Sequence, residues 1–103
     1  MPKTFIEAGN THEIKLGKMK RVEANDKAIL VCNVDGEFYA VDDMCTHEDS
    51  SLYLGCMKGE LVQCSLHGAR FNVKTGEPME EPAEIPLQTY EVKIEGERIL
   101  VKL

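Results

Sequence analysis

Two short segments of this chain each place a cysteine close to a histidine. Cys45 and His47 are separated by one residue, and Cys64 and His67 by two. Sixteen residues lie between His47 and Cys64. Zinc fingers commonly group cysteine with cysteine and histidine with histidine, because one ion takes all four ligands. Here each segment carries one ligand of each kind. This arrangement favours a binuclear iron centre in which one iron is held by two cysteines and the other by two histidines.

That ligand set is the one that holds a Rieske [2Fe–2S] cluster. We therefore predict one such cluster per chain, bound through its irons by Cys45, His47, Cys64 and His67. The alternative is a structural zinc ion held by the same four side chains. The remaining histidine, His12, lies between Thr11 and Glu13 and is expected to be a surface residue.

The segments outside this region have the pattern of β-strands. Apolar and polar residues alternate along 20–24, and 28–34 and 37–41 are rich in strand-forming residues. Asp35 and Gly36 separate the last two runs and predict a tight hairpin, because both turn positions must accept positive φ. A second hairpin is expected from 90–94 and 98–103 around Gly96. Together these strands predict an all-β fold, a small antiparallel sandwich or barrel.

The middle of the chain, from about 43 to 86, is rich in glycine and proline. Only 61–63 and 70–73 look like strands there, and no helix longer than two turns is expected. We predict one domain over 1–103, with a loop-rich cluster-binding subdomain (about 43–86) inserted in a β-rich base formed by 1–42 and 87–103. Each Cys/His segment is then expected in a loop at a strand end, on the rim of a rigid scaffold.

The composition restricts the partners that the chain could bind. With 18 acidic and 12 basic residues in 103, the formal charge is −6. Nucleic acids and anionic membranes call for basic patches, so neither is expected as a partner. No apolar run approaches the roughly 20 residues of a membrane-spanning helix. The first residues also lack the pattern of a secretory signal, so a cytoplasmic location is expected.

Two further cysteines need a separate explanation. In a chain without a secretion signal, cysteines are more often metal ligands or buried thiols than disulfide partners. Cys32 lies in the apolar run 28–32 and is expected to be an inert buried thiol. Cys56 lies between the two Cys/His segments. We expect it to pack as a small apolar side chain rather than to act as a further ligand.

Over its whole length the chain resembles the Rieske-type ferredoxins of bacterial aromatic-ring dioxygenase systems. The resemblance rests on the two Cys/His segments and on Leu52, Gly55, Phe71, 75–76, 82–87 and 90–94. It implies that Cys45 and Cys64 hold a buried iron and that His47 and His67 hold an outer one. It also implies that 82–86 form a third loop that covers the cluster.

Departures from related proteins predict a low reduction potential. High-potential respiratory relatives tie their two ligand loops with a disulfide, where this chain has Ser50 and Leu66. They also have serine and tyrosine hydroxyls that donate to cluster and ligand sulfurs, where this chain has Ala69 and Phe71. A charge-assisted hydrogen bond is worth about 1.5–3 kcal/mol, and about 1.4 kcal/mol corresponds to roughly 59 mV for one electron. We place the potential toward the low end of the range of about −150 to +300 mV for Rieske centres.

The resemblance implies a one-electron carrier, not an enzyme. Electrons would arrive from an NAD(P)H-dependent flavoprotein reductase and leave to the Rieske centre of a terminal dioxygenase. A Rieske oxygenase needs a second iron site, usually of two histidines and a carboxylate, and only His12 remains for it. Two alternatives stay open: a small Rieske subunit of a reductase such as nitrite reductase, and an iron–sulfur redox sensor. Small carriers of this kind are commonly monomers, so a monomer is expected.

Overall fold

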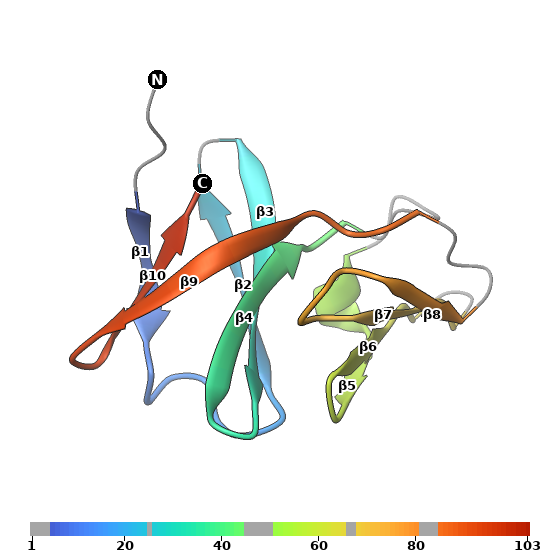
Figure 1. Ribbon diagram of the computed structural model, residues 1–103, viewed down its shortest axis with the longest axis horizontal. Helices are drawn as coiled ribbons and strands as arrows, with labels where there is room; N and C mark the ends of the chain where they lie inside the picture. Colours follow the sequence, from blue (N-terminus) through green and yellow to red (C-terminus); the bar gives the residue numbers. More distant parts are fainter. Residues whose placement is uncertain (1–4, 25, 45–50, 66–67, 81–84) are drawn as a thin grey trace.

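The protein consists of two antiparallel β-sheets that lie side by side (Figure 1). The computed structural model describes residues 5–24, 26–44, 51–65, 68–80 and 85–103. Within these ranges there is no α-helix, and one short 3₁₀ helix accompanies the strands. The all-β fold class predicted from the sequence is confirmed.

The larger sheet has the order β1-β10-β9-β4-β3-β2, and the smaller one the order β5-β6-β7-β8. Every described strand of the larger sheet lies before residue 43 or after residue 88, whereas the smaller sheet lies within 56–80. In Figure 1 the smaller sheet lies beside β4, and β1 and β10 lie on the far side of the larger sheet. The larger sheet contains β1 (Phe5–Asn10), β2 (Met19–Ala24), β3 (Lys27–Val34), β4 (Glu37–Asp42), β9 (Thr89–Glu95) and β10 (Arg98–Lys102). The 3₁₀ helix η1 (Leu52–Leu54) precedes the smaller sheet of β5 (Cys56–Lys58), β6 (Leu61–Gln63), β7 (Arg70–Asn72) and β8 (Pro78–Glu80).

Both hairpins predicted from the sequence are present. Asp35 and Gly36 have φ values of 51° and 92°, as a two-residue hairpin turn requires. They connect β3 and β4 in a regular register from Ile29↔Asp42 to Val34↔Glu37. Gly96, with φ of 62°, lies in the turn between β9 and β10. The local turn chemistry therefore sets the register of these two strand pairs.

Three strands, β1, β5 and β8, are not predicted by the sequence pattern. In β1 the register with β10 shifts between Glu7 and Gly9, and Gly9 has a φ of 140°. This irregularity breaks the alternation that would mark a strand. The other two, β5 and β8, have three residues each and form the edges of the smaller sheet. Such short strands depend on the neighbour that supplies their hydrogen bonds.

The strand β3 is buried on both of its faces and joins the two parts of the core. Ile29 and Val31 pack with Ala8, Ile14, Ala40, Ile99 and Val101 inside the larger sheet. Leu30 and Cys32 belong to a second cluster, which we call the junction core and which also contains Val34, Val41, Leu52, Val62, Cys64, Ala69, Phe71, Val73 and Leu87. Fully burying a large apolar side chain contributes about 1.5–3 kcal/mol. The junction core therefore fixes the smaller sheet against the larger one.

Candidate metal centre

Cys64 is the one predicted ligand that falls within the described part of the chain; Cys45, His47 and His67 lie outside it. Cys64 directly follows β6 and is only 2% exposed. It packs in the junction core and has no disulfide partner among the described residues. Its position at the end of a strand, at the start of the second Cys/His segment, suits a metal ligand on a rigid support.

The ends of the second Cys/His segment are held together by main-chain hydrogen bonds. The Cys64 N–H donates to the Ala69 carbonyl over 2.8 Å, and the Gly68 N–H donates to the Cys64 carbonyl over 3.3 Å. Gly68 has a φ of 73°, in the left-handed region that favours glycine. Together with the pairing of β6 and β7, these bonds close the ends of the segment that contains His67.

The residues that flank the first Cys/His segment, Asp43 and Met44 before it and Ser51 and Leu52 after it, are joined by hydrogen bonds. Met44 and Ser51 form an antiparallel bridge. The Leu52 N–H donates to the Asp43 carbonyl over 2.7 Å. The Asp43 carboxylate accepts hydrogen bonds from the Ser51 hydroxyl (2.5 Å) and from the Tyr53 N–H (3.0 Å). Asp43 carries no signal in the sequence, since nothing in the local pattern shows that this carboxylate is buried.

Gly55 packs the turn after the first Cys/His segment against Gln63, the residue before the second. A Cβ atom on Gly55 would lie 1.8 Å from the carbonyl oxygen of Gln63, the residue before Cys64. Its φ of −89° is available to any residue, so only the close approach requires glycine here. On the other side, Leu52 of η1 is fully buried in the junction core. The turn that follows the first segment therefore packs directly on the strand that leads into the second.

A third segment, 77–86, is fixed at its ends by Gly76 and Leu87. The Leu87 N–H donates to the Gly76 carbonyl over 2.8 Å. Gly76 has a φ of 82°, and a Cβ there would lie 2.3 Å from the Leu87 carbonyl oxygen. The carbonyl of Gln88, the residue after Leu87, accepts a hydrogen bond from the Asp42 N–H. Most of the loop expected to cover the cluster, 82–84, lies outside the described residues, but its far end is attached beside the start of the first segment.

Ala69 and Phe71 stand where high-potential respiratory relatives are expected to have serine and tyrosine hydroxyls. Both are fully buried in the junction core with Cys64. Ala69 accepts the Cys64 N–H, and Phe71 lies opposite Val62 in the β6–β7 ladder. Phe71 is therefore a core residue of the fold. Both side chains are apolar, so neither donates a hydrogen bond to a nearby sulfur.

The two other cysteines differ in their surroundings. Cys32 is fully buried in β3, and burial, together with the charge of Asp43, raises its pKa to about 12. The prediction of an inert buried thiol is confirmed. The expectation for Cys56 is wrong, because its side chain is exposed on the edge strand β5. Successive residues of a strand face opposite sides, and Met57, not Cys56, packs against the junction core.

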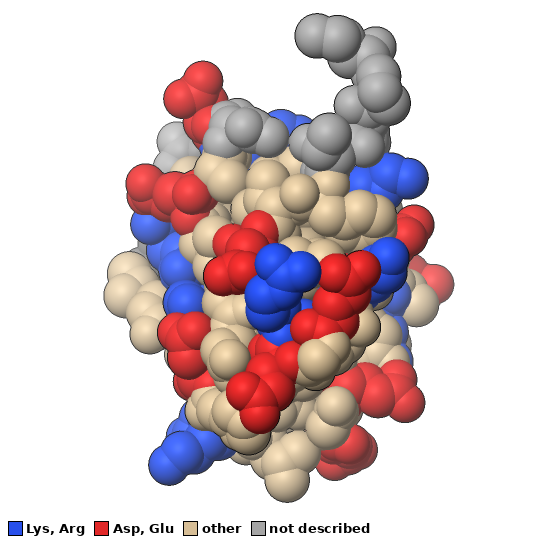
Figure 2. Space-filling model, turned by 90° about the vertical axis from the view of Figure 1, so that its left-hand side faces the viewer, with Lys and Arg blue, Asp and Glu red and all other residues tan. Residues whose placement is uncertain are grey.

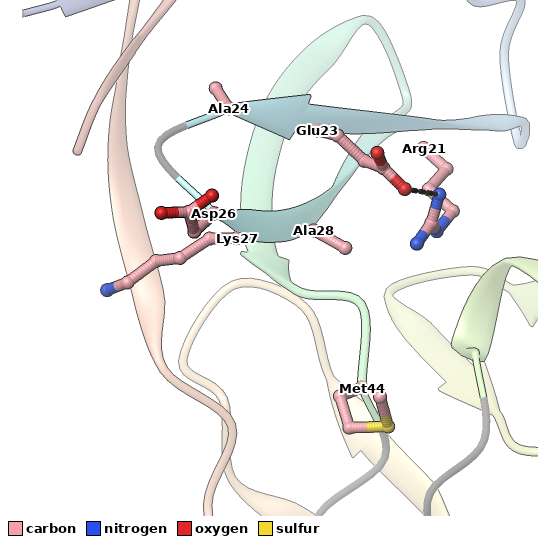
Figure 3. A pocket seen from close by; sticks show the side chains of 7 residues that line it. All are labelled: Arg21, Glu23, Ala24, Asp26, Lys27, Ala28 and Met44. Carbon is pink, nitrogen blue, oxygen red and sulfur yellow. Dashed lines mark hydrogen bonds and ion pairs between the residues drawn. The ribbon is translucent and has the colours of Figure 1, made fainter.

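Several large apolar side chains are exposed next to the three segments. Leu54 is 71% exposed, and Met44, Tyr53, Met79 and Ile85 are also exposed. Met44 further lines an open groove with Arg21, Glu23 and the β2–β3 turn (Figure 3). In contrast, basic and acidic side chains are interspersed on the face shown in Figure 2, on the side of β1, β9 and β10. Leu16 and Ile94 are exposed as well, so exposed apolar side chains are concentrated beside the three segments but are not confined to them.

His12 lies beside the turn between β9 and β10, and Figure 1 shows this turn on the far side of the larger sheet from β5–β8. The exposed His12 ring pairs with Glu97 of this turn over 2.9 Å. The prediction of a surface residue is confirmed. Among the described residues, no group of three metal-binding side chains gathers into a further site. Nor does any helix in the described ranges have the length and apolar character needed to cross a membrane.

Comparison with known proteins identifies the family. The model of the Rieske [2Fe-2S] domain matches residues 4–91. The chain is 47% identical to the ferredoxin component of biphenyl 2,3-dioxygenase from Rhodococcus jostii (strain RHA1), over 84% of this chain and 81% of that protein. It is 36% identical to the ferredoxin component of the naphthalene 1,2-dioxygenase/salicylate 5-hydroxylase systems of Ralstonia sp, over 100% and 99%.

A solved complex of reduced oxygenase and oxidized ferredoxin in carbazole 1,9a-dioxygenase contains a chain with a similar fold. The TM-score is 0.92 at 31% sequence identity, covering 95% of this chain and 92% of that one. The curated relatives above are named as ferredoxin components, which are electron carriers and not catalytic oxygenases. With these matches, the chain belongs to the Rieske [2Fe–2S] domain family, whose iron–sulfur cluster is the cofactor indicated by the two Cys/His pairs.

Proposed function

We propose that this protein carries single electrons from an NAD(P)H-dependent flavoprotein reductase to a terminal aromatic-ring dioxygenase. The observation that carries the proposal is the buried Cys64 directly after β6, with the turn that follows the first Cys/His segment packed on the preceding residue, Gln63. The names of the relatives, ferredoxin components of biphenyl and naphthalene dioxygenase systems, support the same role.

In this proposal Cys45 and Cys64 hold one iron and His47 and His67 hold the other. When bound, the [2Fe–2S] cluster accepts and releases one electron. The described residues fit this group, because Cys64 offers a soft donor in dry surroundings and both segments have closed ends. The junction core excludes water behind Cys64, and the bonds at the segment ends limit movement of the ligands. Both effects keep the reorganisation that accompanies electron transfer small.

The exposed apolar residues beside the segments suit a transient docking surface. Leu54, Met44 and Ile85 expose apolar area that a partner could cover. Such patches on soluble proteins often mark interaction sites. We propose that the terminal oxygenase docks here. The solved carbazole 1,9a-dioxygenase complex, which pairs an oxygenase with a ferredoxin, supports this class of partner.

The absence of hydroxyl groups at Ala69 and Phe71 supports a low potential. Donors to cluster and ligand sulfurs favour the reduced state, which carries more negative charge. Both side chains are apolar and share the junction core with Cys64. We therefore propose a potential near the lower end of the Rieske range.

We also propose that residues 1–103 form one Rieske domain in which about 43–86 are inserted into the base of 1–42 and 87–103. The separation of the strands into two sheets with nearly these bounds supports the division. The monomeric state and the cytoplasmic location remain predictions.

Reconstituted electron transfer tests the function. Purified protein should contain two irons and two labile sulfides per chain and give the EPR signal of a reduced Rieske cluster. A flavoprotein ferredoxin reductase with NADH should reduce it, and a terminal dioxygenase with its aromatic substrate should reoxidise it. A colourless protein with one zinc ion would contradict the cluster assignment. Reduction only by a sirohaem nitrite reductase complex would favour the subunit alternative.

A further inference from the structure

Asp43 is a buried carboxylate that accepts three hydrogen bonds from two different parts of the fold. It is 1% exposed. Ser51 and Tyr53, which follow the first Cys/His segment, supply a hydroxyl and an N–H. The third donor is the Arg21 Nε of β2, at 2.9 Å. Because a buried carboxylate without partners is costly, these donors define one position for the side chain.

The main chain of Asp43 also makes two hydrogen bonds, one to the larger sheet and one to the residue after the segment 44–51. Its N–H donates to the Ala28 carbonyl of β3 over 3.1 Å, and its carbonyl accepts the Leu52 N–H. Asp43 therefore joins the larger sheet to both ends of the segment 44–51. Cys45, the first predicted ligand, is only two residues further along the chain.

We propose that Asp43 positions the first Cys/His segment and that Asp43 and Arg21 act as a charge pair that sets the reduction potential. The proposal rests on the ligand set of the preceding section. A negative charge near the cluster opposes the added electron, and a positive charge favours it. Removing the carboxylate should therefore raise the potential, and removing the guanidinium should lower it.

Burial decides which charges matter. Glu23 also pairs with Arg21, at 2.6 Å, but the Glu23 side chain is 68% exposed and solvent screens its charge. Figure 3 shows this pair at one side of the groove, with Met44 at another. Asp43 is shielded on all sides, and the Arg21 side chain is 39% exposed. Glu23 is thus a matched control, because it contacts the same arginine without being buried.

The decisive test is a set of midpoint potentials measured by voltammetry on holoprotein. Asp43→Asn keeps the shape of the side chain and one acceptor oxygen, and it should shift the potential upward. Arg21→Gln should shift it downward, and Arg21→Lys, which keeps the charge, should shift it less. The double variant Asp43→Asn/Arg21→Gln should fall between the two single variants. Glu23→Gln should keep the parent potential.

Shifts in the same direction for Asp43→Asn and Arg21→Gln, or no shift in either, would overturn the charge-pair proposal. A merely structural role for Asp43 would not reverse the sign of the shift between these variants. If Asp43→Asn does not retain the cluster, Arg21→Gln and Arg21→Lys decide the question. A lower potential in Arg21→Gln but not in Arg21→Lys would show that the positive charge at position 21 sets the potential. A parent protein without a Rieske EPR signal would instead refute the proposed function.

The positioning role has its own measurement. Ser51→Ala removes one donor to Asp43 without changing any charge. Loss of visible absorbance during incubation with an iron chelator should be severalfold faster than in the parent protein. A parent-like rate would overturn the positioning role while leaving the charge-pair result unaffected.

Discussion

Gly55 packs against the main chain of Gln63, the residue that precedes Cys64. A side chain at position 55 would have its Cβ 1.8 Å from the Gln63 carbonyl oxygen, a distance at which the backbone must move. The contact joins the turn after the first Cys/His segment to the strand before the second. It therefore controls the separation of the two segments that are proposed to share the cluster.

Gly55→Ala is expected to destabilise the protein and to reduce its iron content. Overpacking typically costs about 1–3 kcal/mol of unfolding free energy. We expect a value near the upper end, because the new Cβ would meet main-chain atoms, which cannot move aside as a flexible side chain can. Thermal denaturation and iron analysis measure the two effects. Gly59→Ala is the control, because Gly59 has positive φ but no neighbour within 4 Å. It should lose some stability and keep the cluster. Parent-like iron content in Gly55→Ala would contradict the argument.

Ala69→Ser combined with Phe71→Tyr is expected to raise the midpoint potential by tens of mV, up to about 100 mV. Each charge-assisted hydrogen bond of about 1.5–3 kcal/mol corresponds to roughly 60–130 mV, and bonds to the oxidised cluster offset a large part of this gain. Voltammetry measures the shift. Val73→Thr, which adds a hydroxyl elsewhere in the junction core, should not raise the potential. If the double variant and this control behave alike, the explanation of the low potential is wrong.

Cys56 and Cys32 are expected to react very differently with an alkylating reagent. Cys56 is exposed, whereas Cys32 is fully buried with its pKa raised to about 12. Since the thiolate is the reactive form, Cys32 should stay unmodified in the native holoprotein up to about pH 10. Mass spectrometry after brief alkylation should find label on Cys56 and, only after denaturation, on Cys32. Native labelling of Cys32 would contradict the buried position of this thiol.

Tyr90→Phe is expected to destabilise the protein by about 1.5–3 kcal/mol, the typical value of a hydrogen bond to a charged group. The Tyr90 hydroxyl donates to the Asp42 carboxylate where β9 meets β4. Chemical denaturation at pH 7 measures the loss. Tyr39→Phe is the control, because the bond from Tyr39 to Glu37 is exposed, and its loss should cost less.

The pH dependence of stability should also change in Tyr90→Phe. Burial, and then the bond to Asp42, raises the pKa of Tyr90 in the folded protein. The unfolded chain therefore ionises first, near pH 10. The contribution of Tyr90 is fully present below that pH and is lost as the pH rises above it. Denaturation curves should show a steeper alkaline loss in the parent than in Tyr90→Phe. Equal slopes would show that Tyr90 does not contribute.

Local sequence determined the features that depend on neighbouring residues in the chain. Asp35 and Gly36 determine the β3–β4 turn, because few residues accept positive φ at both positions. The continuous apolar run 28–32 predicts a strand buried on both faces, as β3 is. The types and spacing of the two Cys/His pairs predicted the cofactor, because metal chemistry depends on which donors a segment carries.

Only the tertiary structure decided the features that depend on residues far apart in the sequence. The strands β1, β5 and β8 have weak patterns of their own and exist through their partners β10, β6 and β7. The burial of Asp43 depends on Arg21, 22 residues earlier. The requirement for glycine at position 55 comes from an approach to Gln63 that no local pattern records. Side-chain types and turn preferences are properties of the local chain, whereas burial and close contact arise only when distant segments pack.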